Sequence, residues 1–318
     1  MQYIVLDMEW NQAWPGSSAS KLLDGKMRGE IIQIGAVRVT ERQIVGDEFQ
    51  ILIKPTFIRR LNKRVSVLTG IKESQLREEG VLFPEAVRRF REWCGEDCVF
   101  LTWGFDDIAI LKENMTLHGI DSQWVDRWYN AQMIFNAQTD GGTAQKALKT
   151  AMEMAGVEAT RPAHDALGDA YHTAIVCTRL DLPKGMEEYG KAVESHENGF
   201  HGAELPGCLD RRVFHGYQDK ASAMKALAEE ENQCPLCGKP MECGGWISQQ
   251  GKRYIAGAVC PEHGRLFVRL RFAPEENGLK AVRLIYEGDC EAAKALDRTP
   301  AKTRVRKRRC RKKPARVQ

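Results

Sequence analysis

The sequence has no long hydrophobic run: no apolar stretch approaches the roughly 18 residues that a transmembrane helix requires. Its first residues, MQYIVLD, lead straight into an acidic motif and lack the basic, apolar and small-residue regions of a secretory signal peptide. Both absences favour a cytoplasmic protein. We therefore expect the ten cysteines to be reduced or to bind metal. There is also no internal repeat.

Acidic residues are missing from the C-terminal end, where residues 302–316 hold ten Lys and Arg and no Asp or Glu. The formal charge of the chain is +4, so the remainder without this segment carries −6. A basic tail on an acidic body suits contact with a polyanion such as nucleic acid, although such tails also act as solubilising arms. The tail has no apolar periodicity, which predicts disorder.

The remaining chain alternates between strand-like and helix-like patterns. Apolar, β-branched runs predict strands at 2–6, 30–39 and 44–53, the last two forming a hairpin. Helical spacing begins near residue 83, a short buried strand follows at 99–102, and further helices follow, the last at about 166–180. This order predicts an α/β fold with a mixed sheet flanked by helices.

With 318 residues, the chain is long enough for one domain of ordinary size and a smaller one. The periodic pattern weakens after Pro183, and cysteine-bearing, β-rich segments begin near residue 232. We expect four parts: a main α/β domain at 1–185, a connector at 186–230, a small zinc-binding module at 231–297 and a disordered basic tail at 298–318.

Two carboxylates one residue apart, Asp7 and Glu9, are the strongest chemical signal in the sequence. Side chains alternate along a strand, so both acids point to one face and Met8 to the other. Two carboxylates about 7 Å apart repel each other unless a cation lies between them, and hard cations such as Mg²⁺ prefer oxygen ligands. Alone, such a pair is usually a solvent-facing strand end. Here, further acids follow at Asp106 and Asp107 and in HDALGD, from His164 to Asp169.

Within HDALGD, we expect the His164 imidazole and the Asp169 carboxylate to lie in different local structures. Five residues rotate a helix by about 140°, so His164 and Asp169 diverge on a continuous helix. Asp165 is a plausible N-cap, which would leave His164 in the preceding loop and put Asp169 on the inner face of the first turn. The alternative is a capping Asp beside an exposed histidine. His172, one turn later, is a rival base that we expect at the surface.

At these residues the sequence resembles the DnaQ-like DEDDh 3′–5′ exonucleases, which have a ribonuclease-H-like fold. The resemblance covers about residues 1–182 and includes Asp7-Met8-Glu9, EIIQIGAV, LTGI at 68–71 and HDALGDA. The family's second acid is followed by an apolar run ending in Leu, which favours Asp107 over Asp106. The segment TWGFDD is closer to the KapD and Eri-type exoribonuclease branch, in which RNA is a common substrate.

The resemblance implies a two-metal hydrolase that releases 5′-nucleoside monophosphates from a free 3′ end, with RNA favoured over DNA. It implies that His164 is the general base and that two Mg²⁺ or Mn²⁺ ions are held by Asp7, Glu9, Asp107 and Asp169. The alternatives are a DNA-directed exonuclease of the proofreading or repair type and a non-catalytic nucleic-acid-binding adaptor.

Four further residues are candidate substrate contacts. Met8 and Trp10 can stack on a terminal base, since stacking is insensitive to base identity, but Met8 is equally well explained as core packing. By resemblance, Leu68 and Thr69 of LTGI wedge against a base. As plain sequence, LTGI is only a helix stop.

Two copies of one short design, CPLCG and CPEHG, lie in the C-terminal part. They offer Cys234, Cys237, Cys260 and His263 at the spacing of a closed structural zinc site. Cys243 is a spare thiol that could replace His263, and redox pairing of Cys234 with Cys237 is the alternative. The basic side chains of this module either meet phosphates or form a solvated face; they are Lys239, Lys252, Arg253, Arg265, Arg269 and Arg271.

Overall fold

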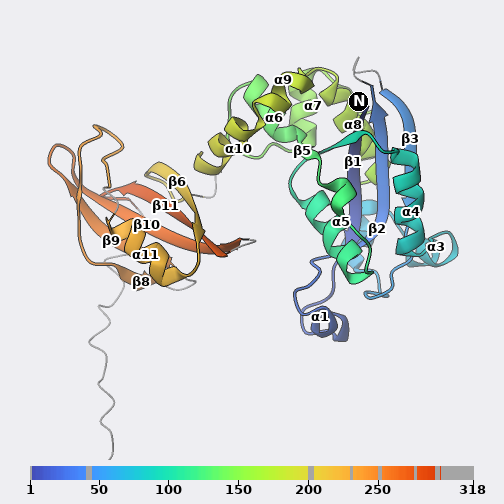
Figure 1. The fold of residues 1–318 in the computed structure, drawn as a ribbon, viewed down its shortest axis with the longest axis horizontal. Coiled ribbons are helices and arrows are strands. Elements are labelled where there is room, and N and C mark those ends of the chain that lie inside the picture. Colours follow the sequence, from blue (N-terminus) through green and yellow to red (C-terminus); the bar gives the residue numbers. More distant parts are fainter. Residues whose placement is uncertain are drawn as a thin grey trace, which may run out of the picture. The chain divides into compact units, whose positions relative to one another are not determined.

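The structure is a computed structural model that describes residues 2–40, 45–199, 204–229, 232–249, 253–275, 278–290 and 294. It divides into two compact units, Met1–His196 and Glu197–Gln318, each with its own sheet (Figure 1). Within the described ranges, no helix has both the length and the apolarity needed to cross a membrane. The predicted basic tail at 298–318 lies outside the described residues.

The first unit contains a five-stranded sheet in the order β3-β2-β1-β4-β5. The strands β1, β2 and β3 are antiparallel, and β4 and β5 run parallel to β1, so the predicted mixed sheet is confirmed. The bounds are Gln2–Asn11 for β1, Glu30–Val39 for β2, Val45–Leu52 for β3, Cys98–Thr102 for β4 and Trp128–Asn130 for β5.

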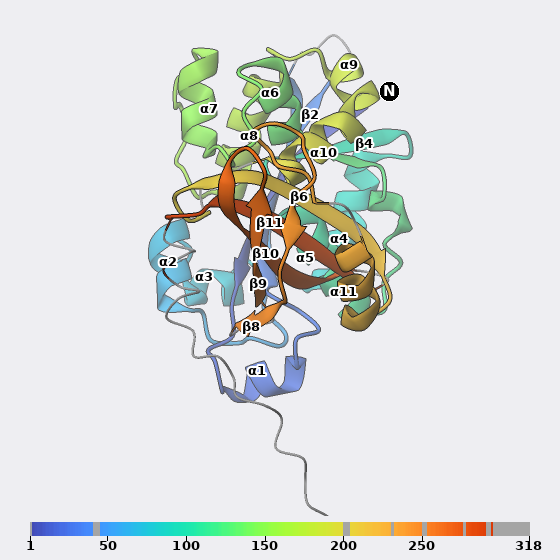
Figure 2. The same cartoon turned by 90° about the vertical axis from the view of Figure 1, so that its left-hand side faces the viewer.

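Helices cover both faces of this sheet (Figures 1 and 2). One core contains Ile4, Leu6 and Met8 of β1 with apolar residues of α4 (Phe83–Cys94) and α5 (Asp106–Leu117). The other core contains Tyr3 and Val5 with residues of α6 (Ala131–Gln138), α7 (Leu148–Ala155) and α8 (Ala166–Cys177). Strict alternation along β1 thus places the next residues of the second series, Asp7 and Glu9, on the face of α8.

Shorter helices connect these elements. They are α1 (Ser18–Leu23), α2 (Lys63–Thr69), α3 (Glu73–Glu78), the 3₁₀ turn Gln123–Val125, α9 (Leu182–Glu187) and α10 (Tyr189–Asn198). β4 ends at Thr102, which pairs with Leu6, whereas β1 continues to Asn11. The last residues of β1 therefore have no strand neighbour on the β4 side, and the start of α5 occupies that position.

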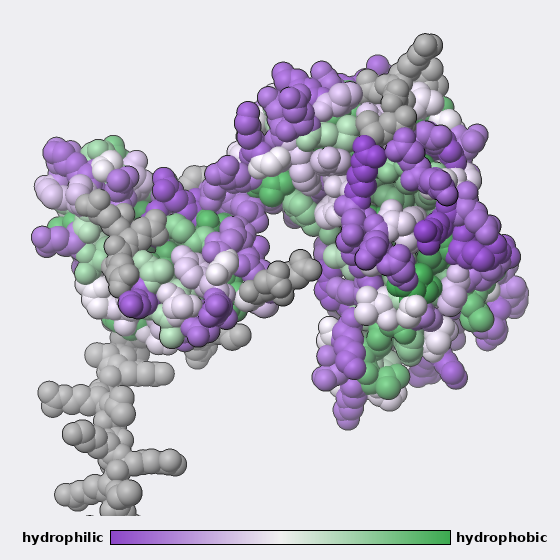
Figure 3. All heavy atoms as spheres, in the orientation of Figure 1, coloured by the Kyte–Doolittle hydropathy of each residue, from purple (hydrophilic) through white to green (hydrophobic). Residues whose placement is uncertain are grey.

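The second unit has a sheet in the order β6-β11-β10-β9-β7, with β8 also paired to β9. Its strands are β6 (Cys208–Tyr217), β7 (Glu242–Cys243), β8 (Ile247–Gln249), β9 (Arg253–Cys260), β10 (Gly264–Glu275) and β11 (Gly278–Glu287). The helix α11 (Lys220–Glu229) packs Ala223 and Leu227 against Leu270 and Phe272. Hydrophilic residues cover much of the visible surface of each unit (Figure 3).

The segment expected to be a connector, 186–230, is instead largely regular structure. It contains α10, β6 and α11, and β6 pairs with β11 as a full strand of the second sheet. The expectation was wrong because β6 is an edge strand of sequence CLDRRVFHGY, in which charged residues interrupt the apolar alternation. Its pairing partner lies about seventy residues later, where local periodicity carries no information about it.

Candidate functional site

Asp7 and Glu9 lie near the end of β1, half-buried and on the face that α8 covers. Met8 points the other way and is only 3% exposed, packed in the first core. The expectation that the Met8 side chain stacks on a base is therefore wrong, because the core formed with α4 and α5 encloses it. Only the main chain of Met8 borders the acids.

The first turn of α5 supplies the third acid. Asp107 is 6% exposed, and its Oδ1 accepts a hydrogen bond from the Met8 backbone N–H at 3.1 Å. Asp106 points outward instead, where Arg28 Nη1 lies 2.7 Å from its Oδ1. The structure thus brings Asp107, and not Asp106, to the acids of β1.

The first turn of the helix α8 carries the fourth acid, Asp169. Asp165 is the N-cap of this helix, as predicted, and its Oδ2 accepts from the Gly168 N–H at 3.0 Å. Two glutamines of the sheet hold this cap: Gln33 Nε2 donates to Asp165 Oδ1 at 2.8 Å and Gln50 Nε2 at 3.0 Å. Capping fixes the direction of the first turn, which carries Asp169.

A glycine lets this turn approach the sheet. Gly35 pairs with Asp7 across β1 and β2, so a side chain there would point to the same face. A Cβ at Gly35 would lie 2.1 Å from the Leu167 nitrogen and 2.2 Å from the Ala166 carbonyl carbon. The backbone of α8 therefore lies directly on β2, in a space that no larger residue permits.

His164 completes the group from the loop before α8. Its backbone is left-handed, with φ of 60°, and its N–H donates to Asp169 Oδ2 at 2.9 Å. Its side chain is exposed, and one ligand atom each of Glu9, His164 and Asp169 lies within 4.8 Å of the others. The strained backbone thus turns the imidazole toward the two carboxylates.

Burial, followed by the crowding of negative charge, raises the pKa values of the acids in the site. Burial, then the neighbouring acids Asp107, Asp169 and Glu9, raise the pKa of Asp7 well above its usual value. Burial and the charges of Asp169 and Asp107 raise the pKa of Glu9 to about 8, and burial raises that of Asp107 to about 7. Burial also raises the pKa of Asp169, against opposing effects of the His164 N–H and ring.

Protein cations do not balance this charge. Over the described residues, no lysine or arginine forms an ion pair with Asp7, Glu9, Asp107 or Asp169. Clustered carboxylate oxygens without a protein counter-ion suit hard divalent cations, which take two or three such ligands together with water. The donor set present therefore fits Mg²⁺ or Mn²⁺.

His172 is excluded as the rival base. It is 2% exposed, not at the surface as expected, and its Nε2 accepts the Thr160 N–H at 3.1 Å. It lies in a helix whose residues Ala170, Thr173, Ala174 and Cys177 are also buried. Its role is to hold the loop that precedes His164.

The other candidate substrate contacts differ in how free their side chains are. Trp10 is half-buried against Gly29, where a Cβ would lie 2.3 Å from the indole Cδ1. Leu68, at the end of α2, is 55% exposed. The Thr69 hydroxyl donates to the Val65 carbonyl at 3.0 Å and accepts the Ile71 N–H at 3.1 Å. Of the three residues Trp10, Leu68 and Thr69, Leu68 is thus the one with an exposed apolar side chain.

Gln33 and Gln50 were not identified from the sequence. Gln33 is buried, and its Oε1 accepts the Ala166 N–H at 3.1 Å in addition to the donation to Asp165. The sequence signal that could have identified Gln33 is its polar amide within the otherwise apolar run IIQIGAV, since buried polar groups need hydrogen-bond partners.

The predicted zinc ligands converge in the second unit. Cys234 Sγ lies 3.7 Å from His263 Nδ1, Cys237 Sγ 3.6 Å from Cys260 Sγ, and Cys260 Sγ 3.8 Å from His263 Nδ1. A tetrahedral site with Zn–S bonds of about 2.3 Å has ligand separations of about 3.8 Å. Cys243 is exposed on β7 and outside this group, and Cys234 and Cys237 are free thiols.

Comparison with known proteins agrees with this geometry. The RNase T exonuclease family model matches residues 4–177. No curated protein matches the chain. A full-length 3′-exonuclease is similar in structure, with 19% identity and a TM-score of 0.50 over 58% of this chain and 82% of that one.

The nuclease domain of 3′hExo, a DEDDh family member bound to rAMP, is similar at 20% identity and a TM-score of 0.50, over 58% of this chain and 94% of that one. These two similarities establish the fold. The family match spans more than half of the chain and includes the four acids and His164. The chain therefore belongs to the RNase T exonuclease family, hydrolases of the phosphodiester bonds of nucleic acids.

Proposed function

We propose that this protein is a metal-dependent 3′–5′ exonuclease that releases 5′-nucleoside monophosphates, with RNA as the preferred substrate. One observation carries the proposal. Four carboxylates and an imidazole from three distant segments of the sequence converge at one end of β1, and no lysine or arginine among the described residues forms an ion pair with these acids. A purely structural role gives no reason to gather so much uncompensated charge.

Each side chain has a distinct task in this proposal. Asp7, Glu9, Asp107 and Asp169 would hold two Mg²⁺ or Mn²⁺ ions, which when bound supply a nucleophilic water and stabilise the charge on the phosphate and the leaving oxygen. His164 accepts the proton of the attacking water. The hydrogen bond from its backbone to Asp169 keeps the base beside the acids.

The preference for RNA is supported by the TWG segment before Asp106, which resembles the exoribonuclease branch. In the fold, this segment shapes the turn into α5: Trp103 Nε1 donates to the Lys146 carbonyl at 3.0 Å, and Gly104 adopts a φ of 133°. The similar 3′hExo domain was solved bound to rAMP, a ribonucleotide. The alternative is a DNA-directed exonuclease.

The test of catalysis compares neighbouring acids. We expect Asp7→Asn and Asp169→Asn to abolish Mn²⁺-dependent release of mononucleotides from a 3′-labelled strand. Asp106→Asn, which alters an exposed acid paired with Arg28, keeps wild-type turnover. Full activity of the Asp7 and Asp169 variants would contradict the assignment of these acids to the active site. The absence of any mononucleotide release by the wild type would leave a nucleic-acid-binding adaptor as the better explanation.

The substrate is tested on matched RNA and DNA strands with free and 3′-blocked ends. Faster degradation of free-ended RNA than of DNA, with no cleavage of blocked strands, supports the proposal. Faster degradation of DNA favours the proofreading or repair alternative, and cleavage of blocked strands contradicts a 3′ exonuclease.

We also propose that Cys234, Cys237, Cys260 and His263 bind one structural Zn²⁺. The support is their set of separations of 3.6–3.8 Å, close to those of a tetrahedral site. We expect one zinc per chain by elemental analysis of the purified protein, lost in Cys260→Ser and kept in Cys243→Ser. Equal zinc content in both variants would contradict this ligand set.

A further inference from the structure

One side of the second sheet carries four arginines. In one row across the strands, Arg211 of β6 pairs with Leu284, which pairs with Arg269 of β10. In the next row, Arg271 of β10 pairs with Arg253 of β9. Paired residues and residues two apart share a side of a sheet, so all four side chains emerge on one face. We call Arg211, Arg253, Arg269 and Arg271 the arginine face.

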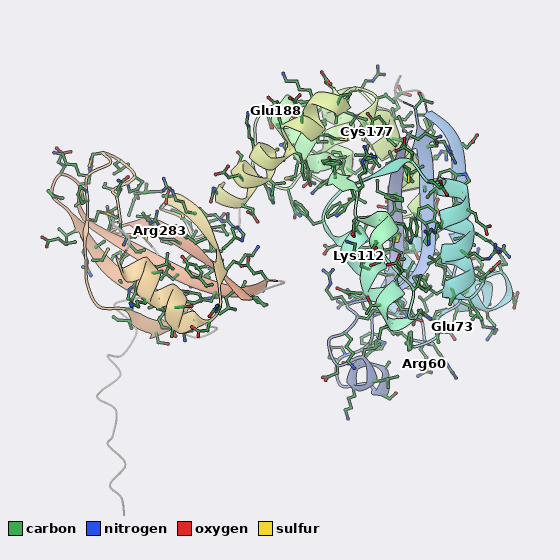
Figure 4. The ribbon with its side chains drawn as sticks, viewed as in Figure 1. Arg60, Glu73, Lys112, Cys177, Glu188 and Arg283 are labelled. Carbon is green, nitrogen blue, oxygen red and sulfur yellow. The ribbon has the colours of Figure 1, made fainter. Side chains whose placement is uncertain are left out.

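Both sides of this sheet carry buried apolar residues: Ile255, Phe267 and Leu284 lie on the side of the arginine face, and a second core lies on the opposite side. Leu270 and Phe272 alternate with the two arginines of β10 and pack under α11. Arg283, which is labelled in Figure 4, pairs with Leu270 and so lies on that side as well. There it has partners: Asn232 Oδ1 accepts from its Nη1 at 3.2 Å, and Asp210 Oδ2 lies 3.6 Å from its Nη2. Arg283 thus has an acidic and an amide partner at its Nη atoms, while its Nε, like those of Arg269 and Arg271, is buried without an acceptor.

Two members of the arginine face have no acidic partner among the described residues, and beside Arg269 lies the side chain of Tyr286. Among the described residues, Arg269 and Arg271 form no ion pair, and their Nε atoms are buried without a hydrogen-bond acceptor. Arg211 lies 3.5 Å from Glu204, but its Nη1 also lacks an acceptor. Burial and the charges of Arg271 and Arg253 lower the pKa of Arg269, while Tyr286 opposes this.

This arrangement costs free energy in the isolated protein. A guanidinium stays charged at any accessible pH, so it cannot relieve its burial by losing a proton. Buried donors without acceptors and adjacent like charges are both destabilising. An anion bound at this face would reduce the repulsion between the neighbouring guanidinium groups.

We propose that the arginine face binds the phosphodiester backbone of a single-stranded nucleic acid. The inference rests on the proposed function for the identity of the polyanion. Guanidinium groups match phosphate oxygens in a planar, bidentate geometry. Arg269 and Arg271 are two residues apart on one strand, a spacing of about 7 Å that is comparable to that of successive phosphates in an extended strand. An acidic protein is the competing partner.

The test uses the full-length chain with Arg269→Gln and Arg271→Gln combined, which keeps size and polarity but removes both charges. Binding of a labelled single-stranded RNA is measured by fluorescence anisotropy over a salt series, in an Asp7→Asn background that prevents degradation. We expect affinity at low salt to fall at least about tenfold. Two lost phosphate contacts make the slope of log K against log salt less steep by about 1.4.

Two controls separate charge loss from unfolding. Arg212 is exposed on the other side of β6, so Arg212→Gln should leave affinity and slope unchanged. The pair Arg269→Lys and Arg271→Lys should keep the wild-type salt slope. With an active Asp7, the double glutamine variant should hydrolyse a p-nitrophenyl ester of a nucleoside monophosphate at the wild-type rate, because that substrate has no strand to hold.

Unchanged affinity and slope in the double variant would overturn the inference, as would an equal loss in Arg212→Gln. Arginine-dependent binding of polyglutamate, with RNA binding unaffected, would assign the face to an acidic protein instead. The two proposals fail separately. A wild type that binds RNA through these arginines but degrades no strand contradicts only the exonuclease proposal, and a double variant that degrades and binds strands normally contradicts only this one.

Discussion

Asp107 Oδ1 accepts the backbone N–H of Met8 at 3.1 Å, which ties the second acidic motif to the middle of the first. The contact exists because β4 stops at Thr102 while β1 continues, so the Met8 N–H has no strand partner on that side. A carboxylate at the start of α5 takes the place of a strand carbonyl. The same group therefore completes the hydrogen bonding of the sheet and contributes charge to the site.

This double task predicts different results for two substitutions of Asp107. Asp107→Asn keeps an acceptor for the Met8 N–H but loses the charge, so we expect near wild-type stability with at least about a hundredfold loss of Mn²⁺-dependent turnover. Asp107→Ala also leaves a buried N–H unpaired and should lower the free energy of unfolding by about 1–3 kcal/mol. Urea unfolding measures the stability, and mononucleotide release measures the turnover. Equal stability of the two variants would show that the hydrogen bond contributes little.

The left-handed backbone of His164 makes a second prediction. Asn tolerates a φ of 60°, whereas a β-branched residue does not. His164→Asn should therefore keep its stability and Mn²⁺ affinity but lose about 10²–10⁴-fold in kcat, the range for removal of a general base. His164→Val should show the same loss of kcat and a stability lower by about 1–2 kcal/mol. Wild-type kcat in His164→Asn would exclude the imidazole as the base.

Much of the site could be predicted from the sequence because it depends on local geometry. Alternation along β1 places Asp7 and Glu9 on one face and Met8 on the other, as the structure shows. The N-cap at Asp165 follows from residue type and position, and it is also confirmed. These features need only the periods of strands and helices and the hydrogen bonds of a helix end.

What the sequence did not reveal depends on contacts between distant segments. Whether the Met8 face is open to substrate is decided by α4 and α5, some eighty to a hundred residues later, and these bury it. The amides of Gln33 and Gln50 matter only because the α8 cap lies above them. Likewise, β6 is a strand because β11 pairs with it. Periodicity predicts which way a side chain points but not what packs against it.

The close approach at Gly35 gives a third prediction. A methyl group there would meet the backbone of Ala166 and Leu167 at 2.1–2.2 Å, so α8 must shift and carry Asp169 away from Asp7. We expect Gly35→Ala to lower both stability and Mn²⁺ affinity, with most turnover lost. In Gly46→Ala on β3, the nearest atom is 3.5 Å away, so this variant should stay within about 0.5 kcal/mol of wild type. Calorimetric titration with Mn²⁺ and urea unfolding compare the two, and wild-type Mn²⁺ affinity in Gly35→Ala would contradict the packing argument.

The raised pKa values of the acids give a fourth prediction, for the metal-free protein. Burial and neighbouring charge raise the pKa of Glu9 from 4.5 to about 8, so the folded state binds a proton that the unfolded state has released. Binding of this proton therefore stabilises the folded state relative to the unfolded state. The stabilisation is fully present below about pH 4.5 and is lost as the pH rises through about 8. Asp107, with a pKa of about 7, acts in the same direction.

We therefore expect the Tm of metal-free protein to fall between about pH 6 and pH 9, and the fall to be smaller in Glu9→Gln, which carries no titrating group at that position. Saturating Mn²⁺ should remove most of the dependence, because the cation stabilises the ionised carboxylates and displaces their protons. Thermal unfolding over a pH series, with and without Mn²⁺, measures both effects. The protein is dialysed into metal-free buffer, because a chelator would also remove the zinc proposed for the cysteine cluster. Two results would contradict this: a Tm that rises with pH over this range, or a Tm that is equally pH-dependent with Mn²⁺ bound. Either would mean that the acids are already ionised and balanced in the metal-free protein. The argument for a cation site from uncompensated charge would then fail.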